Sequence, residues 1–167
     1  MILLIGYGNE LRGDDAIGPL VARALAELRL PGTQVLALTQ LTPELAELVS
    51  QASAAIFVDA ALDGPPGQVE VVPCRPLDLR QPLGHLGNPE SLLALCQAVF
   101  GASPSAWMVK VQVETTELGH PLSPAAQRGI PAAVDVITRL VGQLAPACPE
   151  TASDDRSDHR PTQDTEA

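Results

Sequence analysis

The chain has 167 residues, of which 46% are hydrophobic and 18% are charged, and its formal net charge is −10. This length and composition predict one globular domain over residues 1–145 and a disordered acidic tail over residues 146–167, which has few apolar groups to bury. A strongly acidic surface repels phosphate, so we expect no nucleic-acid partner. The first apolar stretch is too short for a signal peptide or a membrane span, so we expect no membrane association.

The cysteines indicate a reducing environment. Cys74, Cys96 and Cys148 are odd in number and lack the CxxC spacing. The pattern therefore indicates neither a disulfide framework nor a thiolate zinc site. We expect the protein to be cytoplasmic.

The opening of the chain predicts a strand, a loop and a helix. Residues 2–5 form an unbroken apolar run, as in a strand that is covered on both faces, and the two glycines that follow allow a tight turn. Apolar residues then recur at helical spacing over residues 17–28. Asp14 is expected to cap this helix, and Asp15 is expected to lie in its first turn.

The rest of the chain alternates between strand and helix patterns. Further strands are expected at 34–38, 54–58, 68–73 and 107–113, and further helices at 42–52, 88–101 and 123–141. Too few residues separate the strand at 54–58 from the strand at 68–73 for a parallel crossover, so the second should run antiparallel to the first as an edge hairpin. The prediction is a three-layer α/β fold with a mostly parallel, twisted sheet of about five strands, helices on both faces and one antiparallel strand.

Acidic residues follow two of the predicted parallel strands. Asp15 comes after the first strand, and Asp59 comes directly after the strand at 54–58. The carboxyl ends of parallel strands share the edge at which open α/β sheets bind ligands. His85 lies on a long Pro-rich loop, residues 74–87, that can reach this edge. Two carboxylates and one imidazole suit a divalent metal, so we predict a metal site at Asp15, Asp59 and His85.

Each of these residues also has an ordinary structural explanation. Asp14 and Asp15 could only cap a helix, Asp59 could stabilise a turn, and His85 could be an exposed loop histidine. A nucleotide site fits less well, because the glycine spacing departs from the dinucleotide fingerprint and two adjacent carboxylates would repel a pyrophosphate. The sequence leaves open the roles of Asn9, Glu114 and His120.

Four segments of the chain together resemble the motifs of one known family. They are Gly6-Tyr-Gly-Asn-Glu-Leu-Arg-Gly-Asp-Asp-Ala-Ile-Gly18, Val58-Asp59-Ala60, His85-x-x-x-Pro89-x-x-Leu92-Leu93 and Glu117-Leu-Gly-His-Pro-Leu-Ser-Pro124. The family is that of the hydrogenase maturation endopeptidases, and the resemblance covers roughly residues 1 to 142.

This family cleaves a C-terminal extension from the precursor of the nickel-iron hydrogenase large subunit after nickel has been inserted. The resemblance implies the same activity here, with the precursor as partner and the nickel that it carries as a recognition mark. The family's three metal-contacting positions correspond to Asp15, Asp59 and His85, which the resemblance identifies as the catalytic and metal-contacting residues. Some family members have Glu where this chain has Asp15.

A non-cleaving, metal-binding chaperone for the same subunit is the alternative function, because it would use the same ligands. The chain has neither a Ser-His-Asp pattern nor an HExxH helix. A peptidase of this kind therefore needs another source of nucleophile and oxyanion stabilisation, and a metal can supply both.

Overall fold

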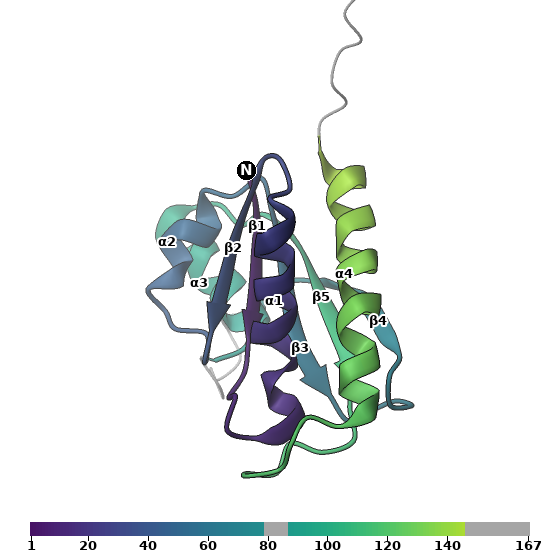
Figure 1. Cartoon of the computed structure of the whole chain (residues 1–167). Coiled ribbons are helices and arrows are strands. Elements are labelled where there is room, and N and C mark those ends of the chain that lie inside the picture. Colours follow the sequence, from purple (N-terminus) through teal and green to yellow (C-terminus); the bar gives the residue numbers. More distant parts are fainter. Residues whose placement is uncertain (79–86, 146–167) are drawn as a thin grey trace, which may run out of the picture.

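The computed structural model describes residues 1–78 and 87–145, and these residues form a five-stranded sheet with helices on both faces (Figure 1). The strands are β1 (Ile2–Tyr7), β2 (Thr33–Leu38), β3 (Ala54–Ala61), β4 (Val69–Cys74) and β5 (Ser105–Gln112). The helices are α1 (Ile17–Leu28), α2 (Leu45–Ser50), α3 (Pro89–Phe100) and α4 (Pro124–Leu144), and a short 3-10 helix, η1 (Gly13–Ala16), precedes α1. The predicted fold class is confirmed.

Two further predictions concern residues outside this part of the chain. His85 and the predicted tail, residues 146–167, lie outside the described residues. Within the residues that are described, none of the helices is long and apolar enough to cross a membrane.

The strand order is β2-β1-β3-β5-β4, with four parallel strands and β4 antiparallel to β5. The predicted direction of β4 is right, but the predicted hairpin with β3 is wrong, because β5 lies between them. The burial of the side chains explains why β5, and not β4, lies next to β3. Ala106, Val109 and Val111 of β5 are buried and suit a central position, whereas β4 exposes Glu70 and carries Pro73, which has no N–H to donate.

Strand alternation divides the apolar side chains into two cores. On one face, residues such as Leu4 and Ile56 pack against α1 and α4. On the other, residues such as Leu3, Ile5 and Phe57 pack against α2 and α3. Central strands that are covered on both faces are what the continuous apolar runs of β1 and β3 predict.

The helices expected at 88–101 and 123–141 begin with side-chain caps, the helix expected at 42–52 is shorter, and the expected cap of α1 is wrong. The side chains of Asn88 and Ser123 each accept a hydrogen bond from the backbone N–H three residues later, at 2.8 and 3.1 Å, and so begin α3 and α4. Asp14 does not cap α1. It lies in η1, and α1 begins at Ile17 without a side-chain cap, because the carboxylate of Asp14 is bound elsewhere.

Candidate active site

Glycines bring the first loop into direct contact with its neighbours. A Cβ on Gly6 would lie 2.0 Å from the carbonyl oxygen of Gly18, so the backbone of α1 packs directly on β1. Gly8 has a φ of +147°, and a Cβ there would lie 1.9 Å from the carbonyl oxygen of Asp15. Larger residues do not fit at these positions, so the glycines hold Asp15 at the carboxyl end of β1.

Asp14 is fully buried and bound by the segment that leads into α4. Its carboxylate accepts hydrogen bonds from the backbone N–H and hydroxyl of Ser123, at 2.6 and 2.7 Å, and from the N–H groups of Glu114 and Thr115. Burial alone would raise the pKa of Asp14, but these hydrogen bonds outweigh burial and lower the pKa. Asp14 is therefore an ionised structural residue that joins the first loop to the start of α4.

Asp15 and Asp59 lie together at the ends of adjacent parallel strands. Gly6 of β1 pairs with Val58 of β3, and the negative charge of Asp15 is close enough to raise the pKa of Asp59. One oxygen of Asp15 accepts the N–H of Asn9 at 2.7 Å. One oxygen of Asp59 accepts the adjacent backbone N–H, also at 2.7 Å. Each half-buried carboxylate is thus held by the backbone through one oxygen.

The environment of Asp59 favours its protonated form. Burial raises the pKa of Asp59 to about 6, and the charge of Asp15 acts in the same direction. Hydrogen bonds from the Tyr7 hydroxyl and the Ala60 N–H partly oppose this rise. A carboxyl group that titrates near 6 and lies beside a second acid is typical of functional sites.

Tyr7, which hydrogen-bonds Asp59, and two residues that interact with Tyr7 were not predicted from the sequence. Tyr7 lies beside Asp59, and burial, followed by the charge of Asp59, raises the pKa of its hydroxyl, which stays a donor. Glu90 lies in the first turn of α3. Its charge also raises the pKa of Tyr7, and its carboxylate hydrogen-bonds the thiol of Cys74. Strand alternation could have located Tyr7, because it continues the face of Leu3 and Ile5; the other two come from distant segments.

The two described cysteines are not suited to nucleophilic chemistry. Burial raises the pKa of the Cys74 thiol to about 12, and Glu90 adds to the rise. Burial also raises the pKa of Cys96, whose thiol donates to the carbonyl oxygen of Ala46. Thiols with raised pKa values and little exposure are poor nucleophiles.

The predicted metal ligands are only partly within the described residues. The structure brings Asp15 and Asp59 together, while His85 lies outside. Among residues 1–78 and 87–145, no group of three or more His, Cys, Asp or Glu side chains is arranged to hold a metal ion. The metal-binding role of the three residues stays a prediction.

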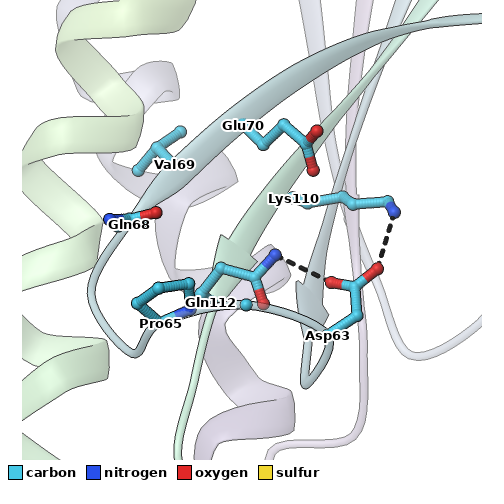
Figure 2. Close-up of a pocket in the computed structure, with 8 residues that line it drawn as sticks. Asp63, Pro65, Gln68, Val69, Glu70, Lys110 and Gln112 are labelled. Carbon is cyan, nitrogen blue, oxygen red and sulfur yellow. Dashed lines mark hydrogen bonds and ion pairs between the residues drawn. The ribbon is translucent and has the colours of Figure 1, made fainter.

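A polar hollow of about 530 Å³ lies against β4 and β5 (Figure 2). One of its lining residues, Lys110, is the partner of Asp59 in the β3–β5 register. Asp63 accepts hydrogen bonds from Lys110 at 3.0 Å and from the side-chain amide of Gln112 at 2.8 Å. Gln112 is buried beneath Gly64, and its side-chain amide binds Asp63. The hollow is lined by Asp63, Gly64, Pro65, Gln68, Val69, Glu70, Lys110 and Gln112.

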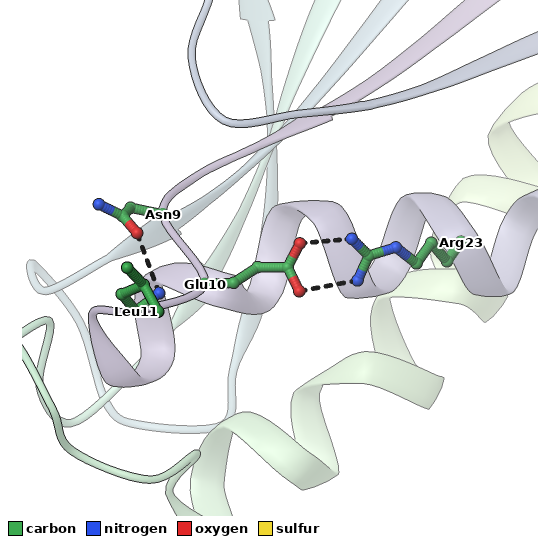
Figure 3. A network of polar contacts seen from close by, with 4 residues as sticks. All are labelled: Asn9, Glu10, Leu11 and Arg23. Carbon is green, nitrogen blue, oxygen red and sulfur yellow. Dashed lines mark hydrogen bonds and ion pairs between the residues drawn. The ribbon is translucent and has the colours of Figure 1, made fainter.

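The loop after β1 is tied to the loop after β5. The guanidinium of Arg12 donates to the carbonyl oxygen of Thr116 at 3.1 Å, and the N–H of Gly119 donates to the carbonyl oxygen of Leu11 at 2.9 Å. The side chain of Asn9 accepts the N–H of Leu11 at 2.9 Å (Figure 3), so Asn9 shapes the loop that carries Asp15.

The two remaining open residues also have structural roles. Glu114 donates its backbone N–H to Asp14. His120 lies 3.1 Å from the carboxylate of Glu117 in an exposed ion pair.

The protein belongs to the three-layer α/β class, and it carries an acid pair at the carboxyl ends of its central strands. No family sequence model matches the chain, and no curated protein sequence matches it. Solved structures do match. The hydrogenase maturating endopeptidase HybD from E. coli has a TM-score of 0.69 and 22% sequence identity, over 85% of this chain and 92% of that chain.

Two archaeal structures show the same likeness. The [NiFe] hydrogenase maturation protease HycI from Thermococcus kodakarensis KOD1 has a TM-score of 0.62 and 23% identity, over 86% of this chain and 90% of that one. The hydrogenase 2 maturation peptidase from Thaumarchaeota archaeon SCGC_AB-539-E09 has a TM-score of 0.62 and 24% identity, over 84% and 97% of the two chains. The chain therefore has the fold of the hydrogenase maturation proteases, the family that its motifs resemble.

Proposed function

We propose that this chain is a hydrogenase maturation endopeptidase, which removes the C-terminal extension of the nickel-iron hydrogenase large-subunit precursor in the cytoplasm after nickel insertion. The convergence of Asp15 and Asp59 in the shared fold carries this proposal. The sequence motifs around both acids support it independently. A likeness in fold would carry less weight if either acid were absent.

In this proposal the nickel belongs to the substrate, and the acid pair binds it. Asp15 and Asp59 are each held through one oxygen by a backbone N–H, which fixes the direction of the second oxygen. His85 is the proposed third ligand. Two carboxylates and one imidazole are fewer donors than nickel takes, so the free enzyme should bind nickel weakly and the precursor should supply the other ligands.

Hydrolysis adds water across the scissile C–N bond, and the described residues suggest how the enzyme assists. Cys74 and Cys96 are unsuited as nucleophiles, so water is the proposed nucleophile. In the chain without its substrate Asp59 has a pKa of about 6, so near neutral pH its carboxylate is available as a ligand or as a proton acceptor. The hollow lined by Lys110, the register partner of Asp59, is proposed to hold residues that flank the scissile bond.

The decisive experiment compares nickel-loaded and nickel-free precursor. Each is incubated with the purified chain, and the mass of the large subunit is measured. We expect a shortened subunit only from the nickel-loaded precursor. Binding of the precursor without any change in mass would instead identify a non-cleaving chaperone, and cleavage of both forms at equal rates would refute nickel as the recognition mark.

A histidine substitution tests the proposed third ligand. His85→Ala should weaken binding and processing of the loaded precursor while leaving thermal unfolding nearly unchanged. His159→Ala is the matched control, because that histidine lies in the predicted acidic tail. Equal processing by the two variants would remove His85 from the site.

A further inference from the structure

Exposed apolar side chains gather at the edge of the sheet that carries the acid pair. Among the described residues, the large hydrophobic side chains that are at least 60% exposed are Leu11 (73%), Leu62 (60%), Val99 (61%) and Leu118 (72%). The three leucines follow β1, β3 and β5 and so lie at the carboxyl edge, whereas Val99 lies near the end of α3. Single exposed leucines are common, but a group at one edge indicates an interaction surface.

Hydrogen bonds join the segments that carry these leucines, which come from distant parts of the chain. The N–H of Gly119 donates to the carbonyl oxygen of Leu11 at 2.9 Å, which places Leu118 next to Leu11. The two loops run side by side at the bottom of Figure 1. The carbonyl oxygen of Ala61, the residue before Leu62, accepts the N–H of Val113 at 2.9 Å, where the second loop begins.

The backbone that presents Leu11 and Leu118 is held in place. The side chain of Asn9 fixes the N–H of Leu11, and the guanidinium of Arg12 binds the carbonyl oxygen of Thr116. A surface that is ordered before binding loses little conformational entropy when a partner arrives.

The charged groups beside these leucines are already paired with each other. Glu10, which precedes Leu11, forms two hydrogen bonds with Arg23 (Figure 3). Glu117, which precedes Leu118, pairs with His120. Apolar residues surrounded by satisfied polar groups resemble the centre and rim of a protein interface. The surface therefore suits an apolar partner patch better than a strongly charged one.

We propose that Leu11, Leu62 and Leu118, the leucine rim, dock an apolar patch on the folded body of the large-subunit precursor. This inference rests on the proposed function. Asp15 comes four residues after Leu11, and Asp59 comes three residues before Leu62. A protein whose metal centre reaches the acids must therefore cover the leucine rim, and a second copy of this chain in that place would cover the acids.

The test uses the full chain with both loop leucines replaced, Leu11→Ser with Leu118→Ser. Val99→Ser is the matched control, because Val99 is an apolar side chain of similar exposure in the last turn of α3. On nickel-loaded precursor we expect the double variant to raise KM at least about tenfold, with kcat within about twofold of wild type, because serine leaves no leucine side chain to bury against the partner. The control should leave both constants unchanged.

Other results would overturn the proposal. An unchanged KM in the double variant would refute docking on the leucine rim, while cleavage by the wild type would keep the proposed function. Wild-type self-association that the double variant abolishes, with precursor binding unchanged, would assign the leucine rim to a second copy.

Precursor binding is measured in parallel, so that the two proposals fail separately. Binding that depends on the leucines, without cleavage, would overturn the protease function and leave the docking surface in place. The single variants Leu11→Ser and Leu118→Ser, each with a smaller expected rise in KM, keep the test decisive if the double variant folds poorly. A wild-type chain that does not bind the precursor overturns both proposals.

Discussion

The carboxyl groups of Asp14 and Asp59 lie at the same edge of the sheet, but their pKa values are shifted in opposite directions. Asp14 accepts hydrogen bonds from three residues of the segment before α4, which lower its pKa despite complete burial. The pKa of Asp59 rises to about 6, because burial outweighs its two hydrogen bonds and Asp15 adds a like charge. Burial, the number of donors and the neighbouring charge together separate the structural acid from the acid that is available for chemistry.

The largest expected effect is on processing. Asp59→Asn removes an anionic oxygen with almost no change in volume, so we expect at least about a 100-fold loss of precursor cleavage with the fold retained. Cleavage is measured by the mass of the subunit, and folding by circular dichroism. A well-folded variant that cleaves normally would end the functional assignment of Asp59 and the contrast with Asp14.

The next largest effect is on stability. Asp14→Asn turns an amide NH2 toward N–H groups that now donate to the carboxylate, so we expect a loss of about 3 kcal/mol in the free energy of unfolding. Urea denaturation measures it. Glu10→Gln is the control, because its exposed pair with Arg23 should contribute little. If both variants lose the same amount, Asp14 is not the structural residue described above.

The pH dependence of stability should have opposite signs at the two acids. The pKa of Asp59 in the folded protein, about 6, lies above its ordinary value of 3.8, so its contribution is favourable in acid and is lost as the pH rises through 6. Asp59→Asn should therefore be more stable than wild type by about 2 kcal/mol near neutral pH and by nothing below about pH 4. The hydrogen bonds that lower the pKa of Asp14 stabilise the fold at pH values above the ordinary pKa of 3.8. This stabilisation is lost as the pH falls further.

Thermal unfolding of the wild type and Asp59→Asn across this pH range measures the difference. A stability difference that does not depend on pH would show that the carboxyl group of Asp59 titrates normally.

The smallest effect should come from the predicted acidic tail. Deleting residues 150–167 should leave processing and thermal stability nearly unchanged, because that segment is polar and acidic and has few apolar groups to pack. A large loss of activity would show that the segment contacts the precursor.

Local patterns predicted most of the fold, and distant partners account for the errors. The apolar runs of β1 and β3 and the caps at Asn88 and Ser123 depend on neighbouring residues, so the sequence predicts them. Asp14 was expected to cap α1 because its real partner, Ser123, lies 109 residues away in the sequence. The β3–β4 hairpin was wrong for the same reason, since the strand that fills the central position comes later in the chain.

The candidate site divides in the same way. Asp15 and Asp59 were predicted because parallel strands bring their carboxyl ends to one edge. Tyr7 was recognisable in principle from strand alternation. Glu90 and Cys74 reach the site only through the packing of α3 and β4, which no local pattern specifies.

The bond between Asp14 and Ser123 also affects when the protein becomes competent during its synthesis. Asp15 and Asp59 have left the ribosome long before Ser123 and the central strand β5 are made. Strand β4 has no sheet partner until β5 is present. A nascent chain that stops before residue 123 lacks the two Ser123 donors that bind Asp14 beside the loop of Asp15. Since domains fold as units once their sequence is complete, the acid pair should form only after the start of α4 has been made.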